Sequence, residues 1–95
     1  MATKHEVLSE NSAFVAALQA GDPEAWEKFA NHYSAKLRQY LLYRLPTAES
    51  IDDVLNEIFI GIARAIRQFA NDVTLSTFVY SIAHRKVADY WRRQT

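Results

Sequence analysis

The side chains best suited to recognising a charged partner are concentrated in the last part of the chain, residues 74–95. Wound as a helix at about 100° per residue, this segment gathers apolar side chains on one side: Leu75, Phe78, Val79, Ile82, Ala83 and Tyr90. The other side mixes cations, small hydrogen-bonding groups and an aromatic ring: Thr77, Ser81, His84, Arg85, Trp91 and Arg92. Such a mixture binds phosphates and stacks on unpaired bases. The alternative is an ordinary solvated helix face.

Charge is distributed unevenly along the chain, although 11 basic and 11 acidic residues give a net charge of zero. From Ser76 to Thr95 there are four cations (Arg85, Lys86, Arg92 and Arg93) against the single carboxylate of Asp89, a balance of +3. The other seven cations and ten acidic residues give −3. The positive C-terminal end fits an anionic partner, and the acidic remainder is compatible with a basic one.

Composition excludes several classes of protein. The 95 residues, of which 49% are apolar and 13% aromatic, suffice for one small domain with a real core. No Cys is available for a disulfide or a thiolate metal site, and the three His residues lack ligand-like spacing. There is also no long apolar run and no N-terminal signal core. We therefore expect a cytoplasmic protein without a membrane segment, a bound metal or a cofactor.

Catalytic motifs are missing from the sequence. It contains no Gly-rich phosphate loop, no nucleophile elbow and no paired catalytic carboxylates. Asp52 and Asp53 are adjacent, but on a helix they point about 100° apart, and no histidine joins them. The chain is therefore not expected to be an enzyme, and no catalytic residue is assigned.

The beginning of the chain divides into two segments. Residues 1–10 are polar and aperiodic, so we expect a flexible leader, followed by a single domain at residues 11–95. Residues 11–20 have apolar side chains at helical spacing and end at Gly21, a residue suited to the position after a helix. A short first helix is therefore predicted at 11–20.

A long second helix is predicted from Pro23 to about Leu45. Asp22 can cap its first amides, Pro suits the first helical position, and Glu24 favours the positive end of the helix dipole. Its apolar stripe has a spacing of three and four residues, which predicts burial: Trp26, Phe29, Ala30, Tyr33, Leu37, Tyr40, Leu41 and Leu45.

A third helix is predicted from about Ile51 to Phe69, after the break at Pro46. Thr47 or Ser50 can cap it, and the spacing of Ser50 and Asp53 resembles a capping box. The predicted buried stripe is Ile51, Val54, Leu55, Ile58, Phe59, Ile62, Ala65, Ile66 and Phe69. With the last segment, these helices indicate an all-α fold, a compact bundle of about four helices.

The outer face of the third helix combines one apolar side chain with polar neighbours. Ile60 lies roughly opposite the buried stripe, among Asp53, Asn56, Glu57 and Arg64. A single exposed Ile is common and need not have a function. An apolar anchor with a polar rim is, however, typical of a site that binds a partner helix.

Residues 70–74, with the sequence Ala-Asn-Asp-Val-Thr, form a short polar break before the last helix. Thr74 or Ser76 can cap that helix. Free backbone amides and side-chain hydrogen-bonding groups therefore meet at this point. The break is either a simple connector or a part of the binding surface of the last helix.

Two segments carry a resemblance to a known family. Residues 50–59 read S-I-D-D-V-L-N-E-I-F, and residues 75–93 read L-S-T-F-V-Y-S-I-A-H-R-K-V-A-D-Y-W-R-R. They are similar to D-A-E-D-L-V-Q-E-V-F and F-x-x-W-L-x-x-I-A-x-N-x-x-x-D-x-x-R-R of region 2 in sigma-70-type RNA polymerase sigma factors, above all in the small extracytoplasmic-function (ECF) group. Both motifs occur in order and at the right separation, so the resemblance, which covers the chain from about Phe14 to Arg93, is fairly specific.

The resemblance implies two interfaces. In the family, the helix of the first motif binds a coiled coil in the clamp of the polymerase β′ subunit, a role that falls here to Asp53, Asn56, Glu57, Ile60 and Arg64. The helix of the second motif and the loop before it contact the −10 element of promoter DNA and help to open the duplex. That role falls to Asn71, Asp72, Thr77, Ser81, His84, Arg85, Lys86, Arg92 and Arg93. An anti-sigma factor is a further partner that the family suggests.

The chain departs from the family pattern at several positions. Asn56 replaces the family's Gln, Ala63 a frequent Trp, Phe78 a Trp, and Arg85 an Asn. These changes bear on contact details and promoter preference, not on the fold. Region 4, which reads the −35 element, has no counterpart before the sequence ends at Thr95, so a fragment or an unusually short protein is expected.

Asp89 is expected to form an ion pair instead of contacting DNA. It lies toward the buried edge of its helix, four residues after Arg85 and four before Arg93. Oppositely charged side chains at this spacing attract each other on a helix, whereas a carboxylate that faces DNA repels phosphate.

Three hypotheses follow for the function. The preferred one is a non-enzymatic sigma-factor domain for transcription initiation that binds polymerase and single-stranded −10 DNA. The second is a helical protein-interaction module, such as a sigma-like regulator that binds a protein and never touches DNA. The third, a small-ligand helical bundle, has only the stripe of Trp26, Tyr33 and Tyr40 in its favour.

Overall fold

Four α-helices joined by short loops make up the part of the chain that the computed structural model describes, residues 4–95, with side chains from Ser12 onward. The elements are α1 (Lys4–Gln19), α2 (Pro23–Leu42), α3 (Ala48–Ala65), a single 3₁₀ turn η1 (Ile66–Gln68) and α4 (Leu75–Arg93). No strand occurs in this range, and the expected all-α fold is confirmed.

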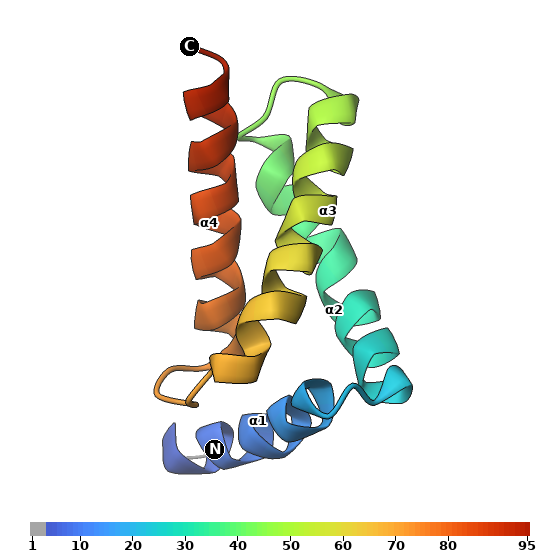
Figure 1. The fold of residues 1–95 in the computed structure, drawn as a ribbon, viewed down its shortest axis with the longest axis vertical. Helices are drawn as coiled ribbons and strands as arrows, with labels where there is room; N and C mark the ends of the chain where they lie inside the picture. Colours follow the sequence, from blue (N-terminus) through green and yellow to red (C-terminus); the bar gives the residue numbers. More distant parts are fainter. Residues whose placement is uncertain (1–3) are drawn as a thin grey trace.

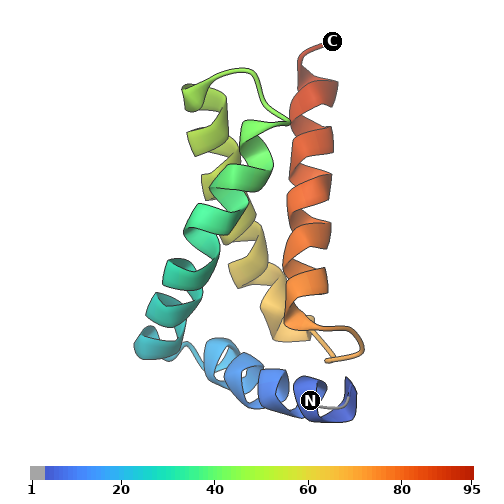
Figure 2. The ribbon, with the colours of Figure 1, turned by 180° about the vertical axis from the view of Figure 1, so that it is seen from behind.

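The helices form a bundle closed at one end by α1 (Figures 1 and 2). α3 and α4 lie side by side, and α2 packs obliquely against α3. The C-terminal end of α2 approaches α4, while its N-terminal end lies near α1. α1 crosses the end of the bundle at which the α3–α4 loop is found. That loop is therefore held between the first helix and the last.

The first helix begins earlier than its sequence suggested. α1 starts at Lys4, inside the stretch that was expected to be a leader at residues 1–10. Residues 1–3 of that stretch lie outside the described residues. Residues 4–10 contain neither Gly nor Pro, so nothing in them interrupts a helix, even though they lack an apolar stripe.

The start of α2 follows the prediction. Asp22 is the N-cap, and its carboxylate accepts a hydrogen bond of 3.2 Å from the amide of Glu24, with Pro23 in the first turn. The end differs, because α2 stops at Leu42 instead of about Leu45. Pro46 disfavours helical backbone at the residue before it. Leu45 nonetheless stays buried, and its amide still donates to the carbonyl of Leu41.

The capping box of α3 uses a different pair from the one expected. Thr47 is the N-cap, and its hydroxyl accepts a 3.0 Å hydrogen bond from the amide of Ser50. The Ser50 hydroxyl in turn accepts a 3.1 Å bond from the Thr47 amide. The reciprocal pair is thus Thr47 with Ser50, and Asp53 takes no part in it. A Ser at the third helical position can do what Glu or Gln usually does there.

The last helix starts as the sequence predicted. Thr74 is the N-cap of α4, and its hydroxyl accepts from the amide of Thr77 at 3.1 Å. The two hydroxyls are also bonded to each other at 2.9 Å. The boundary between the loop and α4 is thereby fixed by side chains of the loop itself.

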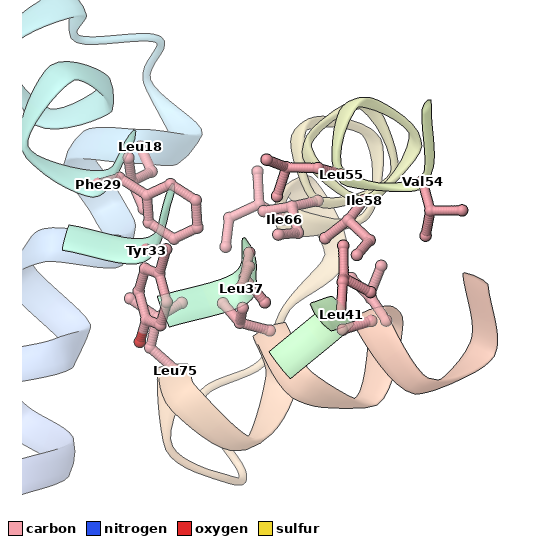
Figure 3. Packing of buried hydrophobic residues seen from close by; sticks show 14 of the residues in the cluster. Leu18, Phe29, Tyr33, Leu37, Leu41, Val54, Leu55, Ile58, Ile66 and Leu75 are labelled. Carbon is pink, nitrogen blue, oxygen red and sulfur yellow. The ribbon is translucent and has the colours of Figure 1, made fainter. Parts of the chain in front are cut away.

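A single hydrophobic core joins all four helices, and most of the predicted stripes are in it (Figure 3). Phe29, Leu37 and Leu41 of α2 are fully buried, and so is Ile58 of α3. Figure 3 shows these side chains in the interior between the helices. Burying each such side chain contributes roughly 1.5–3 kcal/mol. The predicted aromatics Trp26, Tyr40 and Phe59 are only partly buried and line the edge of the core.

α3 and α4 approach closely at Gly61. A methyl group at this position would lie 3.3 Å from a methyl carbon of Ile82 and 3.3 Å from Cε of Lys86. Glycine therefore permits the spacing of the two helices that carry the predicted interfaces. A larger residue would require a neighbour to shift by a few tenths of an ångström.

Hydrogen bonds tie the end of α1 to the elements around it. The side-chain amide of Gln19 donates to the carbonyls of Ile66 (2.7 Å) and Phe69 (3.2 Å), just before the α3–α4 loop. The indole N–H of Trp26 donates to the carbonyl of Leu18 at 3.0 Å. The two Gln19 bonds tie α1 to the chain just before the α3–α4 loop, and the Trp26 bond ties α1 to α2, so α1 helps to position the loop.

Candidate nucleic-acid and protein interfaces

The outer face of α4 presents the side chains that the sequence assigned to DNA. Thr77, Ser81, His84 and Arg85 are exposed, because the opposite side of the helix is held in the core by Leu75, Val79, Ile82 and Ala83. Lys86 is half-buried along the α3 side, next to Gly61. Arg92 and Arg93 are exposed at the C-terminal end.

Two hydroxyl groups of this face are already engaged within α4. The Ser81 hydroxyl donates to the carbonyl of Phe78 at 2.7 Å, and the Thr77 hydroxyl pairs with that of Thr74. A hydroxyl has one proton and two lone pairs. Ser81 therefore faces solvent as a hydrogen-bond acceptor, suited to an amino group on a base.

The α3–α4 loop places Asn71 and Asp72 beside the N-terminus of α4. Asn71 is half-buried and has a positive backbone angle, φ of 59°. Non-glycine residues rarely adopt this conformation, and Asn is among the few that do so readily. Asp72 is exposed, as is Val73. The loop thus has a defined backbone conformation and presents polar side chains at the end of the bundle.

The cations at the end of α4 are paired differently from the expectation. Asp89 bonds Arg92 at 3.0 Å, whereas Arg93 reaches Glu57 of α3 through two contacts of 3.3 and 3.4 Å. Neither Arg85 nor Arg93 pairs with Asp89. The packing of α3 against α4 explains this result, because it offers Arg93 a carboxylate on the neighbouring helix. Within the described part of the chain, Arg85 makes no ion pair.

The outer face of α3 carries the side chains that the sequence assigned to a protein partner. Asp53, Asn56 and Arg64 are exposed, and Glu57 is half-buried beside Arg93. Ile60, at their centre, keeps 46% of its surface exposed. This face therefore combines an accessible apolar side chain with a rim of charges and amides, the pattern of a protein-binding hot spot.

The two surfaces meet in an open groove between the C-terminal half of α4 and the N-terminal half of α3. Asp53, Asn56 and Glu57 line one wall, and Tyr90 and Arg93 line the other. The residues predicted for a protein partner and for DNA are thus not separate patches. They share the Glu57–Arg93 ion pair.

A further cluster lies between the C-terminal end of α2 and α4, where the sequence predicts only core. Tyr40 belongs to the predicted core stripe, but it is only partly buried, and its ring contacts that of Tyr80 with a centroid distance of 5.4 Å. Tyr43 and Arg44, just beyond α2, are exposed next to it. The spacing of Tyr40 and Tyr43 at the end of a helix is the sequence signal that could have marked a second surface.

The third hypothesis, a small-ligand site along α2, receives no support from the geometry. Tyr33 is buried, and its ring contacts that of Phe29 at 4.8 Å. Burial raises the pKa of Tyr33 above its ordinary value of 10.0. The indole of Trp26 is hydrogen-bonded to the end of α1 and partly buried. Tyr33 is therefore core, Trp26 and Tyr40 lie at its edge, and the three side chains do not form one site along α2.

Two negative findings apply to the described part of the chain. Among the side chains from Ser12 onward there is no group of three or more His, Cys, Asp or Glu that could hold a metal ion. Among the described residues, no helix has the length and apolar character needed to span a bilayer.

The fold is that of an all-helical domain of the sigma region 2 type. The family model for sigma-70 region 2 matches residues 29–95, and the chain belongs to this family. An engineered region 2 of sigmaE, solved by NMR in complex with GTAAAA, is similar in structure, with a TM-score of 0.77 and 27% sequence identity over 88% of this chain and 87% of that one. A search among curated proteins found no significant match. Region 2 is a non-enzymatic domain of transcription initiation, and the family implies RNA polymerase and promoter DNA as partners.

Proposed function

We propose that this domain binds the clamp coiled coil of the polymerase β′ subunit through α3 and the −10 element through α4 and the loop before it. The observation that carries the proposal is the division of exposed groups between two helices of a sigma region 2 fold. α3 presents an apolar anchor, Ile60, within a polar rim. α4 presents cations and hydrogen-bonding groups.

The clamp-binding face is formed by Asp53, Asn56, Glu57, Ile60 and Arg64. A coiled coil presents apolar side chains flanked by charges of both signs. This face of α3 offers an apolar side chain for the first and both acidic and basic side chains for the second. Ile60 supplies the central apolar contact, and the rim residues supply register and orientation. An anti-sigma factor that competes with polymerase would use the same face.

In the proposed DNA-binding face, cations bind the backbone and hydrogen-bonding groups contact a base. Arg85, Arg92 and Arg93 bind phosphates, with Lys86 at the edge, and so provide affinity without sequence preference. Asn71, Asp72, Thr77, Ser81 and His84 offer donors and acceptors to an unstacked base. Holding a base outside the stack favours the open form of the promoter, which is how the domain assists melting. Such a factor acts with polymerase in the cytoplasm.

A pair of variants tests the proposal by separating the two functions. Ile60→Asp places a charge in the centre of the α3 face, where it should abolish or strongly weaken binding to core polymerase. Because the side chain is exposed, helicity should be retained, as circular dichroism checks. Its binding to single-stranded −10 DNA should be unchanged.

The complementary variant is the double substitution Arg85→Ala and Arg92→Ala. It should weaken binding to single-stranded −10 DNA while core polymerase is still bound. If this variant binds DNA as well as the unmodified domain does, the alternative of a protein-interaction module is favoured. If Ile60→Asp unfolds the domain, the clamp-binding face is misplaced.

A further inference from the structure

A second groove lies between the C-terminal end of α2 and α4, outside both proposed interfaces. It has a volume of about 390 Å³ and is lined by Lys36, Gln39, Tyr40, Tyr43, Arg44 and Tyr80. The groove is shallow and open to solvent. Three of the six side chains are aromatic, two are cationic and none is acidic.

The aromatic groups of this groove are held in place from two sides. The rings of Tyr40 and Tyr80 meet edge to face, with an interplanar angle of 62°. The guanidinium of Arg44 lies 3.7 Å from the centre of the Tyr40 ring and donates to the Tyr40 carbonyl at 2.8 Å. The indole N–H of Trp91 donates to the carbonyl of Arg44 at 3.0 Å. The groove is therefore preorganised, with α4 fixing the end of α2.

Tyr43 is the most exposed aromatic side chain of this groove. Its side chain keeps 80% of its surface exposed, more than any other large hydrophobic residue whose burial is described. Tyr40 follows Lys36 by four residues and Tyr43 follows Tyr40 by three, so Tyr43 continues the same face of α2. An aromatic ring left open beside two cations has no role in the core.

The charges of the groove favour an anionic occupant. Lys36 and Arg44 make no ion pair within the described part of the chain. The groove also adjoins the DNA-binding face, since Thr77 and His84 lie one turn before and one turn after Tyr80 on α4. A single DNA strand bound along the outer face of α4 would therefore reach the groove directly from that face.

We infer that this groove binds an unpaired nucleotide of the promoter strand, with the base stacked on Tyr43 and the phosphate bound by Lys36 and Arg44. The inference rests on the proposed function, because it extends the path of the same single strand. Stacking on an aromatic side chain tolerates any base. The groove therefore adds affinity for single-stranded DNA without adding sequence preference.

The test uses the 95-residue chain, free and bound to core polymerase, with a labelled single strand that contains the −10 element and three thymines on either side. Tyr43→Ala should weaken binding about 5-fold to 150-fold, the range expected for loss of one stacked base. Tyr43→Phe keeps the ring and should bind normally. Leu42→Ala is the matched control, because Leu42 is exposed on the neighbouring position but does not line the groove.

A photocrosslink gives a second, independent measurement. Single strands with 5-bromouracil at successive positions should crosslink to Tyr43 from one position or two adjacent positions. Lys36→Ala should lower the log–log salt slope of binding by about 0.7, as loss of one phosphate contact on a single strand does.

The outcomes separate this inference from the proposed function. If Tyr43→Ala binds DNA normally while Arg85→Ala does not, the groove is not a nucleotide site and the proposed function stands. If the unmodified domain binds no single-stranded DNA in either form, both fail. If Tyr43→Ala weakens polymerase binding instead, the groove is a protein contact and the inference is overturned.

Discussion

Replacing Arg85 by alanine should weaken the binding of single-stranded −10 DNA by the same factor for every sequence and reduce its dependence on salt. Arg85 is exposed on α4 and makes no ion pair within the described part of the chain. Its guanidinium can therefore bind a phosphate without first leaving a carboxylate. Arg92 and Arg93 differ, because Asp89 and Glu57 hold them at 3.0 and 3.3 Å.

The size of the effect follows from counterion release. Each phosphate neutralised on a single strand contributes about 0.7 to the slope of log K against log salt. A fourfold rise in salt, from about 50 to about 200 mM, therefore weakens one such contact about 2.6-fold, which is 4 raised to the power 0.7. Arg85→Ala should flatten the slope by this full 0.7 or so. Arg92→Ala should flatten it less, because Asp89 already neutralises part of that charge.

The measurement is a salt titration of fluorescence anisotropy with a labelled −10 oligonucleotide, for the free domain at low salt and for the polymerase-bound form. Arg85→Lys retains the charge and should retain the slope. An unchanged slope both in Arg85→Ala and in the double variant of Arg92→Ala and Arg93→Ala would refute a phosphate-binding role for α4.

Three further results are expected. Phe29→Ala should lower the free energy of unfolding by about 3–5 kcal/mol in a urea titration, because the ring is fully buried and contacts the rings of Trp26, Tyr33 and Phe59. Asn71→Gly should keep the loop but change which base is preferred in a panel of −10 oligonucleotides, whereas Asn71→Val should lower the melting temperature, because β-branched residues resist a φ of 59°. Stability should fall as the pH rises above 10.0, because burial raises the pKa of Tyr33 in the folded domain and the unfolded chain therefore loses this proton first. Tyr33→Phe should remove this part of the pH dependence.

Each of these expectations has a contradicting result. A loss of under about 1 kcal/mol for Phe29→Ala would mean that the α2 stripe is not the core. Identical base preferences for Asn71 and Asn71→Gly would place base reading elsewhere on the surface. A pH profile unaffected by Tyr33→Phe would show that the phenol is not shielded from water in the folded domain.

Periodicity was sufficient to predict the helices and most of the core. The apolar stripes of α2, α3 and α4 have regular spacing, and a buried stripe such as Phe29, Leu37 and Leu41 follows from geometry alone. The caps at Asp22 and Thr74 were predictable for a similar reason, since capping is local chemistry between residues two or three apart. The start of α1 was not predictable in this way, because the residues from Lys4 onward have no apolar stripe to read.

Contacts between helices could not be read from a helical wheel. A helical wheel shows only the neighbours of Arg93 on its own helix, and so it predicts a pair with Asp89. In the structure, the packing of α3 against α4 places Glu57 beside Arg93 instead. Tyr43 is not predictable in this way, because it does not belong to the apolar stripe of the predicted helix. Its importance depends on Tyr80, a distant residue in the sequence that tertiary structure brings to the same groove.

The Glu57–Arg93 ion pair makes the two proposed interfaces thermodynamically dependent on each other. A protein partner that takes over Glu57 frees the guanidinium of Arg93 for a phosphate, and a phosphate that takes over Arg93 frees Glu57. By linkage, the factor by which polymerase changes the affinity for DNA must equal the factor by which DNA changes the affinity for polymerase. The pair is exposed, at 57% for Arg93 and 37% for Glu57, and such pairs contribute at most about 1 kcal/mol. This ion pair alone can therefore account for a mutual enhancement of no more than about fivefold.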